Sequence, residues 1–285
     1  MAEDAPFEVH NDAAVAGVLD LVLQASRQAM ENACVRPEDI ATFVTIHATG
    51  HEHPSLADHA AEPLGLRSDV AIVPMTELAC AGGAHALALA ARLARPGEPV
   101  LVGGGEVLSS SFQLQRDVEV GHMGFKFLFG DGGTAAVVTA ERPAGPCLEI
   151  LDSWQYRLPG SLDFYRSRAD RWGIHFDSTP EALAAVGKVV PEIPWLDDDW
   201  DPQFGIVHPG SKLILDEVTA HGGAPYDALR YSRNELENSG NYGGPTLLGV
   251  AARAFDDPPP SGADGVAMSF GPGFRLETSR LRYLA

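Results

Sequence analysis

The stretch Phe43-Val-Thr-Ile-His47 recurs in similar form as Phe204-Gly-Ile-Val-His208, and this recurrence decides the fold. Each copy is an apolar segment of strand length that ends in a histidine, after which a turn leads into a helical pattern. The elements around the two copies follow the same order. We therefore predict two duplicated halves, residues 1–145 and residues 146–285. The alternative is a single doubly wound sheet.

Apolar periodicity predicts that helices and strands alternate in both halves. In the first half, helices are expected at residues 13–33, 55–64 and 81–94, and strands at 41–46, 70–73, 100–102 and 134–140. In the second half, strands are expected at 148–151, 203–207, 266–270 and 274–281, and helices at 181–190, 211–220 and 245–255. This alternation is typical of a layered α/β fold. Only residues 6–10 could supply the first half with a counterpart of the strand at 148–151.

The chain of 285 residues carries 20 Lys and Arg against 39 Asp and Glu, which gives a formal net charge of −19. Such a surface repels phosphate backbones and anionic lipid, so binding to nucleic acid or to a membrane surface is not expected. No apolar run is long enough to span a membrane, and residues 1–12 lack the pattern of a signal peptide. Three cysteines are too few for a disulfide framework. We expect a cytoplasmic protein.

Cys80 lies in Thr76-Glu-Leu-Ala-Cys80-Ala-Gly-Gly83, between a predicted strand and a predicted helix. A thiol at a helix N-terminus faces the positive end of the helix dipole, which favours the thiolate and lowers the pKa of the thiol. The backbone N–H groups of the turn could also hold an oxyanion formed by attack on a thioester. From this pattern Cys80 is either a nucleophile or a small buried residue. Cys34 and Cys147 lack this setting and are interpreted as structural.

Two polar residues of the second half occupy positions that could carry chemistry. His208 ends the predicted strand at 203–207, and the carboxyl ends of parallel strands are where ligands bind in α/β sheets. Asn241 precedes the helix that corresponds in the repeat to the one that Cys80 begins. Taken alone, His208 fits an ordinary hydrogen-bonded histidine, and Asn241 fits a turn in which Asn238 is a competing helix cap.

A metal or nucleotide site receives little support from the sequence. The turn after residue 46 contains His47, His51, His53 and His59. Their spacing is not a usual zinc signature and no cysteine or acidic partner completes it, so no metal is expected. The glycine-rich turns at 102–105, 130–133 and 271–273 match neither a phosphate loop nor a dinucleotide fingerprint.

Five short motifs follow one another in an order that is typical of one family. They are Leu78-Ala-Cys80-Ala-Gly-Gly83, Leu128-Phe-Gly-Asp-Gly-Gly133, His208-Pro-Gly210 with Ile214-Leu-Asp216, Gly240-Asn241, and Phe270-Gly-Pro-Gly273 with Glu277-Thr278. From about residue 13 to the end, the sequence resembles the condensing enzymes of the thiolase superfamily, which include ketoacyl synthase III and the chalcone-synthase-like type III polyketide synthases. The His-Pro-Gly and Phe-Gly-Pro-Gly forms favour the type III group.

The resemblance implies a duplicated thiolase-like α/β fold, with two mixed sheets layered with helices, and a homodimer. It implies that Cys80 accepts an acyl group from a thioester. His208 and Asn241 would bind a malonyl thioester and stabilise the enolate that remains when carbon dioxide departs; the enolate carbon then attacks acyl-Cys80. A cationic His208 would also stabilise the Cys80 thiolate. The implied substrates are acyl-CoA or acyl-carrier-protein thioesters, without a permanently bound cofactor. The expected substrate-binding residues are Gly271, Pro272, Gly273 and Lys212.

Two features depart from the family pattern. The chain begins at what resembles the family's first long helix, so the opening strand and a basic CoA-binding segment are expected to be missing or to be completed by a second chain. Residues 243–245, Gly-Gly-Pro, replace the small hydroxyl residues that usually follow the Gly-Asn turn. An anionic substrate would then need a local basic patch, for which the candidates are Lys212, Arg166, Arg168 and Arg171.

Two other functions stay open at this level. The first is an acyltransferase on the same fold, which would pass the acyl group from Cys80 to an alcohol or amine with His208 as the base. The second is a non-catalytic partner subunit of a condensing enzyme. Asn241 argues against the first, because only enolate stabilisation needs it, and the retention of Cys80 argues against the second.

Overall fold

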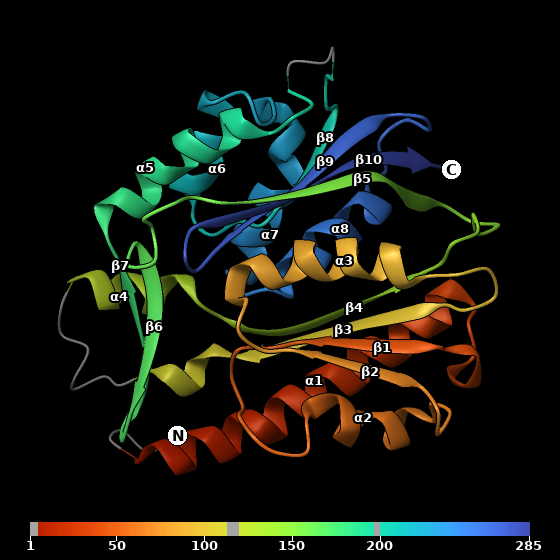
Figure 1. Cartoon of the computed structure of the whole chain (residues 1–285), viewed down its shortest axis with the longest axis horizontal. Coiled ribbons are helices and arrows are strands. Elements are labelled where there is room, and N and C mark those ends of the chain that lie inside the picture. The colour runs from red at the N-terminus through yellow and green to blue at the C-terminus, as the bar shows by residue number, and fades with distance from the viewer. Residues whose placement is uncertain (1–4, 113–119, 197–199) are drawn as a thin grey trace.

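Two four-stranded sheets lie one above the other, with helices between them and on their outer faces (Figure 1). The computed structural model describes residues 5–112, 120–196 and 200–285. Sheet 1 is built from strands that precede residue 139, and sheet 2 from strands that follow residue 146. The predicted layered α/β fold is confirmed. We keep the boundary between the halves at residues 145 and 146 as a proposal.

Sheet 1 has the strand order β2-β1-β3-β4, and only β4 runs antiparallel to its neighbour. Its strands are β1 (Thr42–Ile46), β2 (Ala71–Met75), β3 (Val100–Val107) and β4 (Asp131–Val138). The register places Val44 of β1 between Val73 of β2 and Val102 of β3. β1 and β3 are buried along nearly their whole length, as central strands covered by helices on both faces should be.

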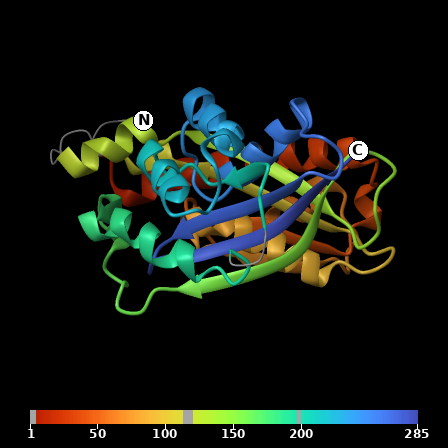
Figure 2. The same ribbon diagram turned by 90° about the horizontal axis from the view of Figure 1, so that it is seen from above.

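Sheet 2 has the order β5-β10-β9-β8, in which β8 and β9 are parallel and the other pairs antiparallel. Its strands are β5 (Cys147–Arg157), β8 (Phe204–Val207), β9 (Asp264–Gly271) and β10 (Arg275–Leu284). Figure 2 shows β5, in green, running beside the blue β10. A separate hairpin pairs β6 (Tyr165–Asp170) with β7 (Gly173–Ser178). The sequence does not predict this hairpin, because β6 is exposed along most of its length and has no apolar alternation.

The helices form three layers around the sheets (Figure 1). Those on the outer face of sheet 1 are α1 (Phe7–Ala33) and α2 (Leu56–Leu64), those between the sheets are α3 (Gly82–Leu93) and α8 (Thr246–Asp256), and those on the outer face of sheet 2 are α5 (Pro180–Val189) and α6 (Lys212–Ala220). α7 (Arg230–Ser239) packs against β8 and α8, and α4 (Val120–Leu128) leads into β4. None of the described helices combines the length and apolar character that a membrane span requires.

The positions of β1 and β8 confirm the duplication that their shared sequence pattern predicts. β1 runs parallel to β3, which pairs with the antiparallel β4. In the same way, β8 runs parallel to β9, which pairs with the antiparallel β10. The helices that follow β1 and β8 cover outer faces, whereas α3 and α8 share the inner layer. The carboxyl ends of β1 and β8 therefore occupy equivalent places in the two halves.

One edge differs between the two sheets. β5 pairs with the outer edge of β10, whereas no strand of the described residues pairs with the outer edge of β4. Residues 7–10, which the sequence offered as part of an opening strand, form the first turn of α1 instead. The backbone N–H of Phe7 donates to the carbonyl oxygen of Arg171 at 2.9 Å, which ties this turn to the β6–β7 hairpin.

Candidate active site

Cys80 lies in a tight turn at the start of the inner helix α3. A short 3-10 turn covers Ala79–Ala81, directly before α3 begins at Gly82. Ala79 has a φ of 42°, in the left-handed region, which bends the chain sharply just before the thiol. Cys80 is only 7% exposed. A reacting group must enter the interior of the protein to reach it.

Two glycines allow other segments to approach this turn closely. A Cβ atom at Gly82 would lie 2.6 Å from Cγ2 of Ile46, and a Cβ atom at Gly83 would overlap the carbonyl oxygen of Gly244. Only glycine fits at such close approaches. The end of β1 and the turn before α8 are therefore packed directly against the helix that Cys80 precedes.

His208 follows the last residue of β8 and is 1% exposed. Its backbone N–H donates to the carbonyl oxygen of Met268 at 2.8 Å, which extends the pairing of β8 with β9. Neither Nδ1 nor Nε2 of the ring has a hydrogen-bond partner among the described residues. Because an unpaired buried polar group is costly, two open nitrogens at this depth indicate a place for a polar ligand atom.

Asn241 lies in the turn between α7 and α8 and is 2% exposed. Its Oδ1 accepts a hydrogen bond from the backbone N–H of Gly243 at 2.9 Å. Its Nδ2 donates to the carbonyl oxygen of Gly210 at 3.4 Å. Since Gly210 is two residues beyond His208, the amide and the imidazole belong to loops in direct contact.

The Cys80 thiol, in the first half of the chain, contacts groups from the second half. Its Sγ lies 4.0 Å from Oη of Tyr165, on the β6–β7 hairpin. Burial raises the pKa of the Cys80 thiol to about 11, and hydrogen bonding with Tyr165 and with Asn241 offsets only part of this effect. The structure thus brings Cys80 and Asn241 together, and Asn241 in turn contacts the His208 loop.

The charge states of the resting site differ from those expected from the sequence. Burial lowers the pKa of His208 to about 3, so the imidazole is neutral, and Cys80 is a neutral thiol. The expected lowering of the Cys80 pKa by the helix N-terminus is therefore wrong. Desolvation of a thiolate in this buried turn outweighs the local effect of the helix, and it disfavours an imidazolium at His208 in the same way.

Glu106 is a buried acid near Cys80 that the sequence pattern does not single out. It lies on β3 and is 1% exposed. Its Oε1 accepts from the backbone N–H of Ala48 at 2.8 Å, and its Oε2 accepts from the N–H and hydroxyl of Thr49 at 3.0 and 2.7 Å. Burial raises the pKa of Glu106 to about 8. The one sequence feature that could have identified Glu106 is its position, because an acidic residue directly follows the apolar and glycine run at 100–105.

Replacement of Glu106 by Gln should change how stability depends on pH. The ordinary carboxyl pKa is 4.5, whereas the folded protein keeps the Glu106 proton up to a pH of about 8. The contribution of this proton is present below pH 4.5 and is lost as the pH rises toward 8, by at most about 1.4 kcal/mol per pH unit. Urea unfolding at about pH 5 and about pH 7.5 should therefore show a smaller loss of unfolding free energy in Glu106→Gln than in wild type. An equal loss in both proteins would contradict the raised pKa.

Aromatic rings form a wall beside the site. The ring centroid of Phe129 lies 5.2 Å from that of Phe125 and 5.3 Å from that of Phe176, and Phe125 lies 6.4 Å from Tyr165. These rings come from α4, from Phe129 directly after α4, and from the β6–β7 hairpin. An open groove of about 400 Å³ adjoins the wall and borders the His208 loop; it is lined by Gly124, Phe125, Phe127, Leu128 and Ser211. An apolar ligand segment could lie in this groove.

The expected substrate-binding residues lie in two places. Gly271 ends β9 directly behind the Cys80 turn, where a Cβ atom would lie 2.5 Å from Cβ of Ala81. Pro272 and Gly273 form the turn before β10, and Gly273 has a φ of 69°. Lys212 is the exposed first residue of α6. Their role in binding stays a prediction.

Two of the three arginines expected to join Lys212 in a basic patch have acidic partners, whereas Arg171 lies over the ring of Trp172. Arg166 lies 3.0 Å from Asp163, and Arg168 lies 3.7 Å from Asp170. Both arginines lie on β6, and Asp170 ends the same strand. Acidic groups of the hairpin region therefore offset the charge that these two arginines could offer to an anionic substrate.

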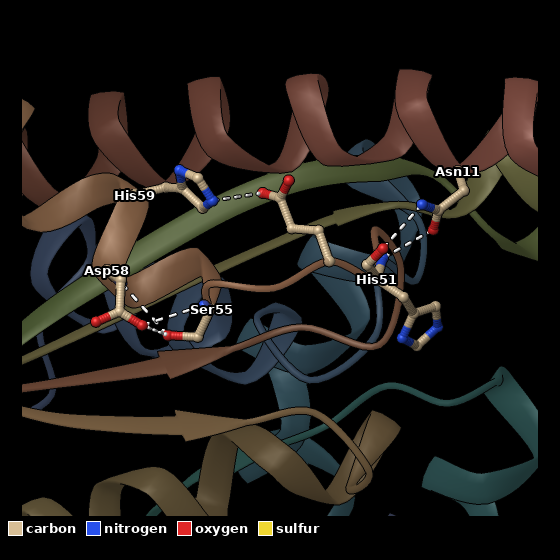
Figure 3. Close-up of polar contacts among 6 residues, drawn as sticks. Asn11, His51, Ser55, Asp58 and His59 are labelled. Atoms are coloured by element: carbon tan, nitrogen blue, oxygen red, sulfur yellow. Dashed lines mark hydrogen bonds and ion pairs between the residues drawn. The ribbon is translucent and has the colours of Figure 1, made fainter.

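The histidine-rich turn is held by separate contacts rather than by a shared ligand (Figure 3). Nε2 of His59 lies 3.5 Å from Oε1 of Glu52, and the backbone N–H of His51 donates to Oδ1 of Asn11 at 2.8 Å. Nδ1 of His47 is paired with a backbone carbonyl oxygen. Within the described part of the chain, no group of three His, Cys, Asp or Glu side chains is placed to hold a metal ion.

Comparison with known proteins assigns this chain to a family. Residues 2–142 match the N-terminal domain model of chalcone and stilbene synthases, and residues 185–285 match the C-terminal domain model. The chain belongs to the chalcone and stilbene synthase family. The resemblance to the type III group that the five motifs carry is thereby confirmed.

Several relatives of known activity are similar to this chain over most of its length. 1,3,6,8-Tetrahydroxynaphthalene synthase of Streptomyces griseus is 31% identical over 96% of this chain and 75% of the relative. Phloroglucinol synthase of Pseudomonas fluorescens is 30% identical over 89% of this chain and 74% of the relative. The structure of germicidin synthase from Streptomyces coelicolor, a type III polyketide synthase, is 29% identical and has a TM-score of 0.92 over 100% of this chain and 77% of that chain.

Members of this family are condensing enzymes with the thiolase-like fold. Type III polyketide synthases catalyse the decarboxylative Claisen condensation of malonyl-CoA with an acyl starter, which gives polyketides. The chain is accordingly a condensing enzyme of the polyketide-forming kind.

Substitution of Gly271 by Ala should displace the turn that carries Cys80. The added Cβ would press on Ala81, next to Cys80. A misplacement of about 1 Å can cost about 100-fold in rate. We therefore expect the rate of Cys80 acylation to fall by that order, and intact-protein mass spectrometry measures this rate. Gly145→Ala is the matched control, because a Cβ there meets nothing within 4 Å. Wild-type acylation by Gly271→Ala would contradict the tight packing.

Proposed function

We propose that this chain is a type III polyketide synthase whose catalytic residues are Cys80, His208 and Asn241, and whose substrates are an acyl-CoA starter and malonyl-CoA. The observation that carries the proposal is His208, a buried imidazole with two unpartnered nitrogens on the loop that the Asn241 amide contacts. Two neutral donors near a buried thiol suit a thioester oxygen on which negative charge develops.

In the first step, Cys80 takes the acyl group from the starter. Its sulfur attacks the carbonyl carbon of the thioester, the carbon–sulfur bond to CoA breaks, and CoA leaves as a thiol. Because the pKa of Cys80 is raised, the thiol proton must be removed as the new bond forms. The two open nitrogens of the neutral His208 ring could relay this proton to the departing CoA sulfur, so that no imidazolium persists in the buried site. The product, acyl-Cys80, carries no charge, which suits a buried position better than a thiolate does.

In the second step, Asn241 and His208 donate hydrogen bonds to the carbonyl oxygen of malonyl-CoA. The bond between its C2 and the carboxylate breaks, carbon dioxide leaves, and the electron pair remains as the enolate. C2 then attacks the carbonyl carbon of acyl-Cys80, a carbon–carbon bond forms, and the Cys80 sulfur leaves as a thiolate that takes up a proton from solvent. The amide of Asn241 does not titrate, so it donates at any pH.

Two other readings of the same site are less well supported. An acyltransferase would need Cys80 and a base but not the buried amide of Asn241. A non-catalytic subunit would not need a buried imidazole with open nitrogens on the loop that Asn241 contacts. Release of carbon dioxide from malonyl-CoA by wild type but not by Asn241→Ala would separate condensation from simple acyl transfer.

We also propose a homodimer, without a permanently bound cofactor. The outer edge of β2 supports this proposal, because no strand of the described residues pairs with it and Ala71 is exposed on it. Unpaired edge strands are ready to join another chain. Sedimentation equilibrium should give twice the mass of 30.3 kDa, and a monomer at every concentration would contradict the proposal.

The test of the proposed function uses the purified chain with malonyl-CoA and a set of acyl-CoA starters. We expect carbon dioxide release, an acyl adduct on Cys80 and a product that contains a new carbon–carbon bond. The same assay with acyl-carrier-protein thioesters in place of CoA thioesters decides the carrier of the substrate. Absence of both carbon dioxide release and an adduct on Cys80 with every thioester would overturn the proposal.

A further inference from the structure

A buried network of three side chains encloses the residue that follows Asn241. Tyr242 is 4% exposed, and its hydroxyl donates to Oε1 of Glu235 at 2.6 Å. Oε2 of the same carboxyl accepts from Nε of Arg253, also at 2.6 Å. Glu235 lies on α7 and Arg253 on α8, with Tyr242 in the turn between these helices. The network therefore links both helices to the turn that carries Asn241.

The ring of Tyr242 lies in a slot formed by two glycines. A Cβ atom at Gly132 of β4 would lie 2.8 Å from Cγ of the ring, and a Cβ atom at Gly249 of α8 would overlap the hydroxyl. The backbone N–H of Tyr242 donates to Oγ1 of Thr246 at 2.9 Å. Packing on both sides of the ring, together with the hydrogen bonds of the hydroxyl and of the backbone N–H, holds Tyr242 in one position.

The peptide of Asn241 is thereby held from two sides. On one side, its N–H donates to the carbonyl oxygen of Leu128 at 2.9 Å, and its carbonyl oxygen accepts from the N–H of Gly130 at 3.0 Å. On the other side, its chain neighbour Tyr242 is anchored by Glu235. A side chain with two χ angles on a backbone fixed in this way has little freedom to turn away from the Cys80 and His208 loops.

The network keeps Tyr242 as a hydrogen-bond donor. Burial raises the pKa of Tyr242, and the hydrogen bond to Glu235 raises it further. Arg253 supplies the opposite charge to the buried carboxyl of Glu235, since the two lie 2.6 Å apart. Removing the hydroxyl alone would leave Oε1 of Glu235 without its donor. The residue next to Asn241 would then lose its hydrogen bond to α7.

We propose that Glu235, Tyr242 and Arg253 form a positioning network that holds the Asn241 amide in place for decarboxylation. These three are positioning residues, because the contacts above connect them to Asn241 and not to the reacting atoms. The inference rests on the proposed function of Asn241, and it adds residues for which the five family motifs give no sign.

The test compares Tyr242→Phe with Tyr231→Phe. Tyr231 is a matched control: it lies on α7, is 3% exposed, and its hydroxyl donates to the carbonyl oxygen of Asp257, just beyond α8. At saturating malonyl-CoA, Tyr242→Phe should release carbon dioxide at least about tenfold more slowly than wild type, while alkylation of Cys80 by iodoacetamide stays within about twofold. Tyr231→Phe should leave both rates within about twofold. Glu235→Gln, which keeps the side-chain shape, should slow decarboxylation in the same direction.

The outcomes separate this inference from the proposed function. Asn241→Ala is measured in parallel. If it decarboxylates as fast as wild type, the role of Asn241 fails and the network has no function to support. If Asn241→Ala is slow but Tyr242→Phe and Glu235→Gln are as fast as wild type, only the network proposal fails. An equal fall of decarboxylation and Cys80 alkylation in Tyr242→Phe, matched by Tyr231→Phe, would show a general loss of structure and would also overturn it.

Discussion

Replacement of Cys80 by alanine should reduce the rate of condensation by about 1,000-fold or more, because no thiol is then present to form the acyl thioester. The decarboxylation of malonyl-CoA should persist in this variant, since the proposed donors to the thioester oxygen are His208 and Asn241. The two activities of the site should thus come apart. Intact-protein mass spectrometry measures the acyl adduct, and carbon dioxide release from labelled malonyl-CoA measures the decarboxylation.

The other two cysteines supply matched controls. Cys34 is exposed at the end of α1, and Cys147 is half-buried at the start of β5. Cys34→Ala and Cys147→Ala should acylate and condense at wild-type rates. An acyl adduct that survives in Cys80→Ala but disappears in Cys147→Ala would show that the wrong thiol has been assigned.

Local rules made the three proposed catalytic residues candidates, and the family resemblance supplied their roles. Cys80 stands between a strand and a helix, His208 ends a strand, and Asn241 precedes the helix that matches α3 in the repeat. Such positions follow from short-range periodicity, and the duplication relates them to one another. The motifs around them then point to one family, which the domain matches confirm.

Other parts of the site depend on packing between distant segments and leave no local pattern. Tyr165 reaches Cys80 from a hairpin whose first strand is mostly exposed, and Glu106 meets Thr49 from a strand more than fifty residues away. The direction of the pKa shift of Cys80 likewise cannot be predicted from local sequence. The helix that follows it can be predicted from sequence, but the burial that raises its pKa depends on how the two halves close over it.

Replacement of Asn241 by alanine should slow decarboxylation by about 100-fold, the usual cost of removing one donor to a developing oxyanion. His208 would remain to hold the thioester oxygen, but the Nδ2 donor that now faces Gly210 would be lost. Acylation of Cys80 by a starter should continue, because that step requires the thiol and a base. Asn241→Ala should therefore form the acyl adduct on Cys80 but release little carbon dioxide, which is the opposite of the result expected for Cys80→Ala.

The control for Asn241 lies three residues earlier, in the last turn of α7. Asn238 is exposed, and its amide donates to the backbone and side chain of Asn234 on α7. Asn238→Ala should decarboxylate malonyl-CoA at the wild-type rate. If Asn238→Ala and Asn241→Ala lose decarboxylation equally, the fold of the turn rather than the amide of Asn241 is responsible. If Asn241→Ala loses acylation of Cys80 as well, the separation of the two steps between Cys80 and Asn241 is wrong, because a residue that acts only on the enolate leaves the earlier transfer intact.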